Sequence, residues 1–246
     1  SKISKRKNPV SVTYYQQSGY LPAALLNFLG LMGGGMPAGG SAEGGDSRAK
    51  NVEAEIFSLA QMQERFDFAK ISLGGPVFDL TKLKWLNGEY IRRLTPAEFL
   101  DALRETIFSD DYLARIAPLV QTRVETLANF GDMADFFFSD DVIPTPEVFI
   151  PKKKTLEETL AFAAEQLAVL EATDFSTEAL EPALKKLGEE KQWAVKDNFM
   201  LLRAIVTGST ASPPLLESLI VFGKARTLDR MRRFLEAHKK LGVSKK

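Results

Sequence analysis

The sequence predicts a mainly helical protein that includes one small unit of mixed α/β character. Helix-capping patterns and helical periods run almost without interruption from Thr95 onward. A proline-rich segment at 140–154 is typical of a boundary between two helical units. The exception is the run I-S-L-G-G-P-V-F at Ile71–Phe78, where tandem glycine and proline indicate a turn flanked by extended backbone.

Three short helices are expected in the N-terminal part. The first covers Pro22–Met32, with proline suited to a first-turn position. The second begins at the capping box Ser58–Gln61 and reaches Phe66. Asp79 caps the third, which we expect to end at the pair Asn87-Gly88.

The remainder is expected to be helical almost throughout. Thr95 and Thr155 each open a capping box, and Trp85 and Trp193 lie on apolar helix faces that predict core positions. The predicted helical segments lie at 95–103, 112–127, 130–138, 155–171, 176–187, 193–206 and 213–222, and a long amphipathic helix completes the chain. The expected domains are 1–93, 94–147 and 148–246.

Composition narrows the functional classes. The 32 basic and 32 acidic residues of the 246-residue chain cancel, so net charge alone indicates no nucleic-acid partner. The lack of cysteine excludes disulfides and thiolate metal sites and fits a reducing cytoplasm. No apolar run approaches the roughly 20 residues of a membrane-spanning helix. We therefore expect a cytoplasmic protein with no membrane partner and no metal site.

Positive charge gathers at both ends of the chain. Between Lys224 and Lys246, basic residues recur throughout, and the acidic residues are only Asp229 and Glu236. This segment could contact a phosphate backbone, or it could be a solvated helix end whose cations complement the helix dipole. The sequence does not decide between these two alternatives.

The first seven residues form a polar, strongly basic loop. Lys2, Lys5, Arg6 and Lys7 supply the cations, and Ser4 adds a hydroxyl donor. Lysines act as mobile point charges and arginine as a bidentate fork, a combination that suits a polyphosphate. For an arbitrary protein, the simpler interpretation of such a loop is a solvated basic terminus or an expression remnant.

The residues that follow favour the phosphate interpretation. The run K-I-S-K-R-K-N-P, followed by G-Y-L-P-A-A-L-L-N-F-L-G-L-M-G, resembles the second signature motif of class I aminoacyl-tRNA synthetases, in the form found in bacterial glutamyl-tRNA synthetases. Similarity to that family continues through Ile71–Ile91, Arg123–Phe138 and Leu201–Leu219. The helical character of residues 95–246 is similar to the glutamyl branch, because the glutaminyl enzymes have a β-barrel anticodon-binding region.

The resemblance implies a fragment with particular functions. It implies the C-terminal half of a glutamate–tRNA ligase, composed of the signature loop, a mixed α/β stem-contact domain and two helical anticodon-binding subdomains. ATP with Mg²⁺ would serve the full enzyme, and the fragment alone is expected to bind neither and to be inactive. Its partner would be tRNA-Glu, or also tRNA-Gln, and it would be a monomer. The alternatives are a stand-alone helical tRNA-binding or adaptor protein and a purely structural helical module.

The resemblance also implies roles for single residues. Lys2, Ser4, Lys5 and Arg6 match the loop that grips the ATP phosphates, where they would stabilise charge developing on pyrophosphate. At the other end, residues that match the anticodon contacts of the family are Arg203, Ser212, Pro213 and Leu215. The alternative is that Arg203 is an ordinary surface residue and Ser212-Pro213 only a helix start.

Two features depart from the family pattern, and one residue is set aside. Asp135 stands where some relatives carry an arginine that reads the last anticodon base, and aspartate accepts hydrogen bonds where arginine donates them. Discrimination between tRNA-Glu and tRNA-Gln is therefore in doubt. The glycine-rich segment 33–55 is longer than usual in the family, and its composition predicts a flexible excursion without an assigned function. His238, the single histidine, is expected to lie on the polar side of the last helix.

Overall fold

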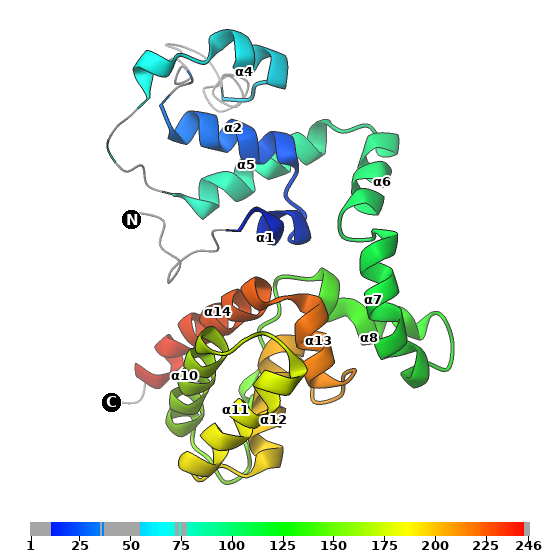
Figure 1. Cartoon of the computed structure of the whole chain (residues 1–246), viewed down its shortest axis with the longest axis vertical. Helices are drawn as coiled ribbons and strands as arrows, with labels where there is room; N and C mark the ends of the chain where they lie inside the picture. The colour runs from blue at the N-terminus through cyan, green and yellow to red at the C-terminus, as the bar shows by residue number, and fades with distance from the viewer. Residues whose placement is uncertain (1–10, 35, 37–54, 72–73, 75–77, 244–246) are drawn as a thin grey trace. The chain divides into compact units, whose positions relative to one another are not determined.

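The chain folds into two compact helical units. The computed structural model describes residues 11–34, 36, 55–71, 74 and 78–243 (Figure 1). The first unit comprises residues 1–107 and the second residues 108–246. No strand occurs among the described residues, so the mainly helical fold class is confirmed. Most of Ile71–Phe78, where extended backbone was predicted, lies outside the described residues, and the mixed α/β character stays a prediction.

The first unit is built around two helices that pack along each other. Its helical elements are α1 (Val12–Gln17), α2 (Pro22–Met32), α4 (Leu59–Arg65), η1 (Phe68–Lys70), α5 (Leu80–Arg93) and α6 (Pro96–Glu105). Helix α2 packs on α5 and α4. The fully buried Asn27 of α2 joins these elements, because its Oδ1 accepts from Phe57 N at 2.7 Å and from the Tyr90 hydroxyl at 2.9 Å.

Helix α5 does not end where the sequence predicted. The expected stop at Asn87-Gly88 is wrong, since the helix continues to Arg93. The Asn87 side chain does not terminate its own helix: its Oδ1 accepts from Leu21 N at 2.8 Å and fixes the start of α2. An asparagine-glycine pair was interpreted as a helix end, whereas here the asparagine is a tertiary contact.

The second unit encloses one continuous apolar core. Its helical elements are α7 (Asp110–Val120), η2 (Gln121–Arg123), α8 (Asn129–Phe138), α9 (Pro146–Phe149), α10 (Leu156–Ala172), α11 (Thr177–Glu190), α12 (Val195–Thr207), α13 (Leu215–Phe222) and α14 (Lys224–Val243). Helix α10 packs along α14, and α11 packs on α10, α12 and α13. Trp193 is buried in this core and stacks on Phe162 with ring centroids 4.0 Å apart, as the sequence predicted for a core residue. Trp85 of the first unit is only half-buried.

In the second unit, one predicted helix is wrong, and the predicted domain limits stay predictions. The single helix expected over 112–127 is wrong, because α7 ends at Val120 and only the short η2 follows. Thr126 and Asn129 then form a local turn in which Asn129 Oδ1 accepts from Thr126 N at 3.1 Å. Leu127 consequently lies 91% exposed instead of on a buried helix face. The segment 140–154 lies inside the second unit, where α9 packs on α12. The predicted domain limits at 93 and 147 stay predictions.

Candidate nucleic-acid interface

The turn after α12 is set by Thr207, the last residue of the helix, and by Gly208, which follows it. Gly208 ends the helix in the left-handed conformation, with φ of 73°. A Cβ at this position would lie 2.8 Å from Val142 Cγ1, so both the backbone and the available space require glycine. The Thr207 hydroxyl donates to Arg203 O at 2.9 Å and accepts from Ser209 N at 3.3 Å. The chain therefore leaves α12 in one defined direction and turns toward α13.

Arg203 fastens this turn to the helix. Its Nη1 donates to Pro213 O at 2.9 Å, to Ser212 O at 3.1 Å and to Ser212 Oγ. Burial lowers the pKa of the half-buried guanidinium, and the positive charge of Arg123 acts in the same direction. We call Arg203, Ser212, Pro213 and Leu215 the Arg203 turn. The structure thus brings together four residues that the sequence singled out from separate positions.

The members of the Arg203 turn are not equally accessible. Ser212, Pro213 and Leu215 are buried, whereas Arg203 is partly exposed. Its three bonds all start from Nη1, which leaves Nε and Nη2 to a ligand as far as the described residues show. The three buried residues hold the guanidinium in place, and Arg203 is the residue of the turn that can reach a ligand. Helix α13 begins at Leu215 with Pro214 as its cap, so Ser212-Pro213 is not simply a helix start.

Asp135 lies on α8, away from the core. Its side chain is exposed, while its neighbours Phe136 and Phe137 are buried. Its position permits contact with a ligand, and its carboxylate can only accept hydrogen bonds when ionised. The role of Asp135 as a base-reading residue stays a prediction.

An apolar groove near Arg123 was not foreseen from the sequence. It has a volume of about 620 Å³ and is lined by Leu113, Ala117, Val120, Gln121, Val124, Leu127 and Phe130. Arg123 lies within the same sequence stretch, and its charge acts on Arg203. The predicted continuous helix hid this groove, because it placed Leu127 on a buried face. The clue in the sequence was the pair Thr126 and Asn129, whose side chains make the turn.

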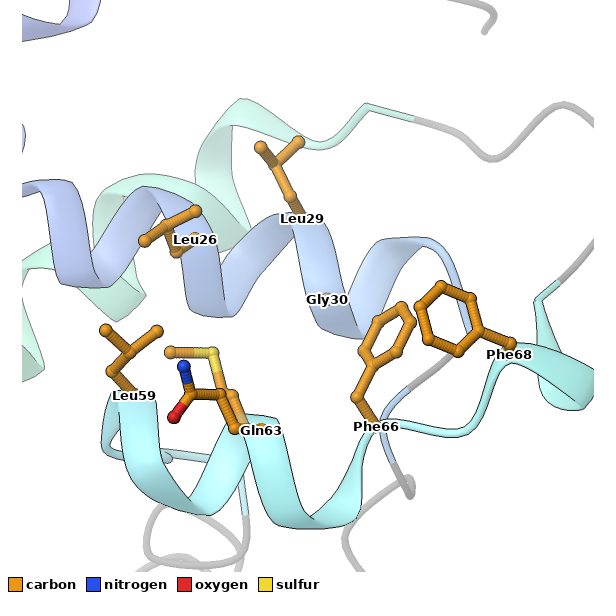
Figure 2. Close-up of a pocket in the computed structure, with 8 residues that line it drawn as sticks. Leu26, Leu29, Gly30, Leu59, Gln63, Phe66 and Phe68 are labelled. Atoms are coloured by element: carbon orange, nitrogen blue, oxygen red, sulfur yellow. The ribbon is translucent and has the colours of Figure 1, made fainter.

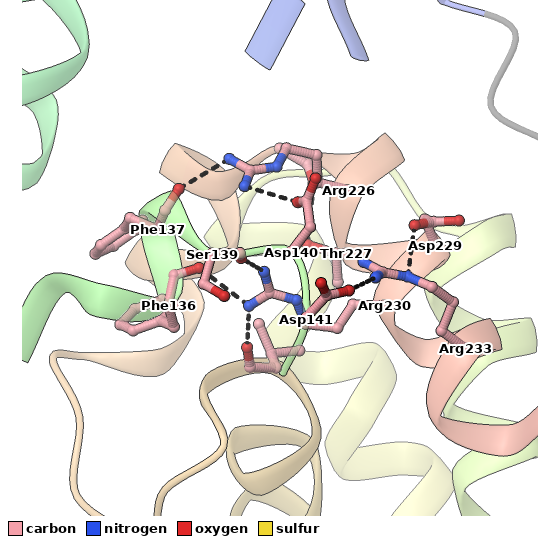
Figure 3. A network of polar contacts seen from close by, with 12 residues as sticks. Phe136, Phe137, Ser139, Asp140, Asp141, Arg226, Thr227, Asp229, Arg230 and Arg233 are labelled. Carbon is pink, nitrogen blue, oxygen red and sulfur yellow. Dashed lines mark hydrogen bonds and ion pairs between the residues drawn. The ribbon is translucent and has the colours of Figure 1, made fainter. Parts of the chain in front are cut away.

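Two arginines of the C-terminal segment lie inside the protein. Arg226 and Arg230 of α14 are 2% and 1% exposed, and the Phe222 ring centroid lies 4.2 Å from each guanidinium carbon. Figure 3 shows both side chains reaching the end of α8. Lys224 Nζ donates to Thr173 O at 2.8 Å, at the end of α10. Arg226 and Arg230 therefore fit neither alternative proposed from the sequence: they are not part of a solvated helix end, and they do not form a phosphate-binding surface.

Burial and like charge act together on Arg230. Its pKa falls to about 9, first because of burial and next because of the charge of Arg226, while Asp140 acts in the opposite direction. At neutral pH the guanidinium is therefore still protonated. Arg226 Nη2 lies 3.0 Å from Asp140 Oδ1, so the carboxylate balances part of the buried charge.

His238 is not a surface residue, and that prediction is wrong. It is 4% exposed, and its ring lies between Phe149 and Phe234, with centroid distances of 4.9 and 4.6 Å. Its Nδ1 lies 2.8 Å from Phe234 O. The helical pattern placed His238 on the polar side because α9, which covers it, could not be located from the sequence.

The first unit carries an open apolar groove between α2 and α4. It has a volume of about 550 Å³, and Figure 2 shows the side chains of both helices directed into it. Its lining consists of Leu26, Leu29, Gly30, Leu59, Met62, Gln63, Phe66 and Phe68. Leu59 and Phe68 are among the exposed large apolar side chains of the protein. We call this feature the α2/α4 groove.

The predicted phosphate loop stays a prediction. Lys2, Ser4, Lys5 and Arg6 lie outside the described residues. Within the described part of the chain, acidic, histidine and cysteine side chains do not cluster into a metal site. The same residues include no helix long and apolar enough to cross a membrane.

The sequence of the chain matches two known protein families. The sequence model of the anticodon binding domain matches residues 89–235, and that of the catalytic domain of class I tRNA synthetases (E and Q) matches residues 1–85. The chain belongs to the anticodon-binding family. The predicted resemblance to glutamyl-tRNA synthetases is confirmed, since its homologues are glutamate–tRNA ligases.

Individual relatives show how much of such a protein this chain spans. It is 39% identical to a glutamate–tRNA ligase of Stutzerimonas stutzeri, over 96% of this chain and 45% of the relative. It is 38% identical to one from Pseudomonas putida, over 100% of this chain and 47% of the relative. A crystal structure of a glutamate tRNA ligase from Elizabethkingia meningosepticum matches 92% of this chain and 43% of its own, at 25% identity and a TM-score of 0.49. The chain thus spans about half the length of these relatives.

Proposed function

We propose that this chain is the tRNA-binding portion of a glutamate–tRNA ligase. The whole enzyme would activate glutamate with ATP and Mg²⁺ and transfer it to tRNA-Glu. The observation that carries the proposal is the pair of family matches, catalytic and anticodon-binding, which together extend over most of the chain. Lys2, Ser4, Lys5 and Arg6 would hold the ATP phosphates in the whole enzyme. The stand-alone adaptor is disfavoured because the curated relatives are ligases.

The Arg203 turn would contact the anticodon. The guanidinium is held at Nη1 by the turn itself, so it is already ordered before tRNA binds. Partial burial strengthens its hydrogen bonds to an unstacked base or a phosphate, because the local dielectric is lower than in bulk water. Ser212, Pro213 and Leu215 would keep the turn in position, and Asp135 would accept a hydrogen bond from a base.

Several finer statements complete the proposal. The region before α6 would be a stem-contact domain with some extended backbone at residues 71–78. The protein would act as a cytoplasmic monomer without a membrane partner. Its tRNA partner would be tRNA-Glu, and discrimination against tRNA-Gln would depend on what Asp135 contacts.

A binding experiment with matched variants tests the proposal. The chain is titrated with unmodified tRNA-Glu, tRNA-Gln and an unrelated tRNA over a salt series, with Arg203→Ala and the control Lys196→Ala. Lys196 is an exposed cation on the same helix. Loss of a base contact at Arg203 is expected to weaken tRNA-Glu binding by about tenfold or more and to remove the preference for it. Lys196→Ala should leave that preference unchanged.

The possible outcomes separate the parts of the proposal. Equal binding of tRNA-Glu and tRNA-Gln, with loss of both on Arg203→Ala, would indicate relaxed discrimination at Asp135. A loss of affinity for all three tRNAs with a shallower salt dependence would indicate a phosphate contact instead of a base contact. Identical binding of the three tRNAs, indifferent to Arg203, would refute the assignment of the Arg203 turn.

A further inference from the structure

The two predicted base-reading residues lie on different helices, each close to its helix end. Asp135 is followed by the last turn of α8, which ends at Phe138. Arg203 is followed by the last turn of α12, which ends at Thr207. Helix α8 packs chiefly on α7. Reading neighbouring anticodon bases with both residues requires that the ends of α8 and α12 keep one fixed relative position.

Arg230 of α14 bonds to the ends of both helices. Its Nη1 donates to Phe136 O at 3.0 Å on α8 and to Val206 O at 2.5 Å on α12. Its Nη2 donates to Ser139 O, directly after α8. One planar guanidinium thus joins two helix C-termini, as Figure 3 shows for its contacts around α8. The position suits a cation, because the last carbonyls of a helix carry partial negative charge.

Arg226 provides an internal comparison. It lies one helical turn earlier on α14, is equally buried and sits at the same 4.2 Å from the Phe222 ring. Its hydrogen bonds go to Phe137 O at 3.0 Å, to the Tyr112 hydroxyl at 3.3 Å and to Asp140 at 3.0 Å. These partners belong to α7, α8 and the segment after α8. Arg226 therefore holds α8 without reaching α12.

We propose that Arg230 is a positioning residue for tRNA discrimination, which fixes the end of α8 that carries Asp135 against the end of α12 that carries Arg203. The inference rests on the proposed function of those two residues. Arginine is required because its fork presents several donors in one plane, whereas a lysine ammonium is a single point that cannot span two helix ends in the same way. Among the described residues, Arg226 holds the end of α8 to α7 and α14 but makes no hydrogen bond to α12.

Distance measurements test the positioning directly. Because the chain has no cysteine, Asp132→Cys on α8 and Lys196→Cys on α12 can each carry one spin label. Both positions are exposed. The distance distribution between the labels is measured in the otherwise native chain, in Arg230→Lys and in Arg226→Lys. We expect a broader distribution in Arg230→Lys and an unchanged one in Arg226→Lys.

Binding measurements on the same variants, without labels, test the consequence. The ratio of affinities for tRNA-Glu and an unrelated tRNA should fall about tenfold in Arg230→Lys and stay unchanged in Arg226→Lys, while circular dichroism shows both to be folded. Arg230→Gln, which also lacks the fork, is the second variant and should behave like Arg230→Lys. A purely structural role would change thermal stability without changing this ratio.

The outcomes distinguish this inference from the proposed function. If Arg203→Ala leaves the tRNA preference intact, the proposed anticodon contact of Arg203 is refuted, and the positioning role of Arg230 is refuted with it. If Arg203→Ala removes the preference but Arg230→Lys keeps both the narrow distribution and the preference, only the positioning role is refuted. A broadened distribution with an unchanged preference also refutes it. Loss of the folded state in both Arg230 variants would likewise assign Arg230 to stability alone.

Discussion

The two units differ in the polar groups that they bury. The second unit buries two guanidiniums within a large apolar core and pairs their Nη atoms with carbonyl oxygens, the Tyr112 hydroxyl and one carboxylate. In the described part of the first unit, the buried polar side chains are the uncharged amides of Asn27 and Asn87. Each unit has an open apolar groove, the α2/α4 groove in the first (Figure 2) and the groove at Leu127 in the second. The difference teaches that the second unit depends on its internal cations, whereas the described part of the first holds its helices together with uncharged amides.

The largest effect is expected from removing the buried cation of the second unit. Arg230→Met leaves the carbonyls of Phe136, Ser139 and Val206 without their donor, so the free energy of unfolding should fall by about 3 kcal/mol or more. Denaturant unfolding in a Trp85→Phe background measures this, because Trp193 then reports on the second unit alone.

The control for this prediction lies on the same helix. Arg232 is paired with Glu171 at 2.5 Å, but its side chain is 21% exposed and that of Glu171 is 41% exposed. Arg232→Met should therefore cost about 1 kcal/mol or less. Equal losses of stability in Arg230→Met and Arg232→Met would show that the second unit does not depend specifically on the buried Arg230.

A smaller loss of stability is expected from replacing one buried asparagine in each unit. Asn198 Nδ2 donates to Leu184 O at 2.6 Å, and its Oδ1 accepts from Gln166 at 2.7 Å. Asn198→Ala should cost about 1–3 kcal/mol, because buried partners are left unsatisfied. Asn27→Ala should cost a similar amount, but it should be detected at Trp85 and not at Trp193. A loss at both tryptophans from either variant would show that the units unfold together.

The next largest effect on stability is expected at two capping boxes, each made of a threonine and a glutamate, that lie in different surroundings. Thr155 and Glu158 cap α10, which contributes Phe162 and Leu170 to the core. Thr95 caps α6, none of whose residues is buried. Thr155→Ala should cost about 1 kcal/mol of global stability. Thr95→Ala should fray α6 and change global stability less, which hydrogen exchange of the α6 amides would detect.

The Thr155 box also has a pH signature. Hydrogen bonds from Thr155 lower the pKa of Glu158 below its usual 4.5. A lowered carboxyl pKa stabilises the folded state above pH 4.5, and this contribution is lost as the pH falls through the lowered value. The stability difference between the native chain and Thr155→Ala should therefore shrink between pH 7 and strongly acidic pH. A difference that grew on acidification would contradict this origin.

The smallest effect on stability is expected at the α2/α4 groove. Leu29→Ser and Leu59→Ser change partly exposed side chains, so unfolding free energies should move by about 0.5 kcal/mol. Binding of a fluorescent apolar dye should nevertheless fall, because these residues line the open groove. The matched change Leu219→Ser in the buried core of the second unit should destabilise that unit strongly. Unchanged dye binding in both groove variants would mean that the groove does not take up apolar molecules.

Local signals predicted the helices well and the tertiary use of polar residues poorly. The capping boxes at Ser58, Thr95 and Thr155 form as expected, because their bonds lie within four consecutive residues. Asn87 and His238 were misinterpreted, because their partners are remote in sequence. A helix pattern shows which side chains share a face, but not which element covers that face.

The candidate site shows the same limit. Arg203 and Ser212 were selected through family resemblance, and the structure adds the bonds that join them. The α14 arginines could not have been identified as buried from the sequence, since a basic run usually marks a solvated face. Nothing local indicates that Arg230 meets the carbonyls of Phe136 and Val206.

Gly208 determines where this surface can change over evolution. A side chain there would require an unfavourable backbone conformation and would displace Val142. At the other end, Arg203 holds the loop at Ser212 and Pro213. Between these anchors, Thr210 and Ala211 are exposed. The loop therefore has fixed ends and an exposed middle, where residues can be replaced without rebuilding the fold.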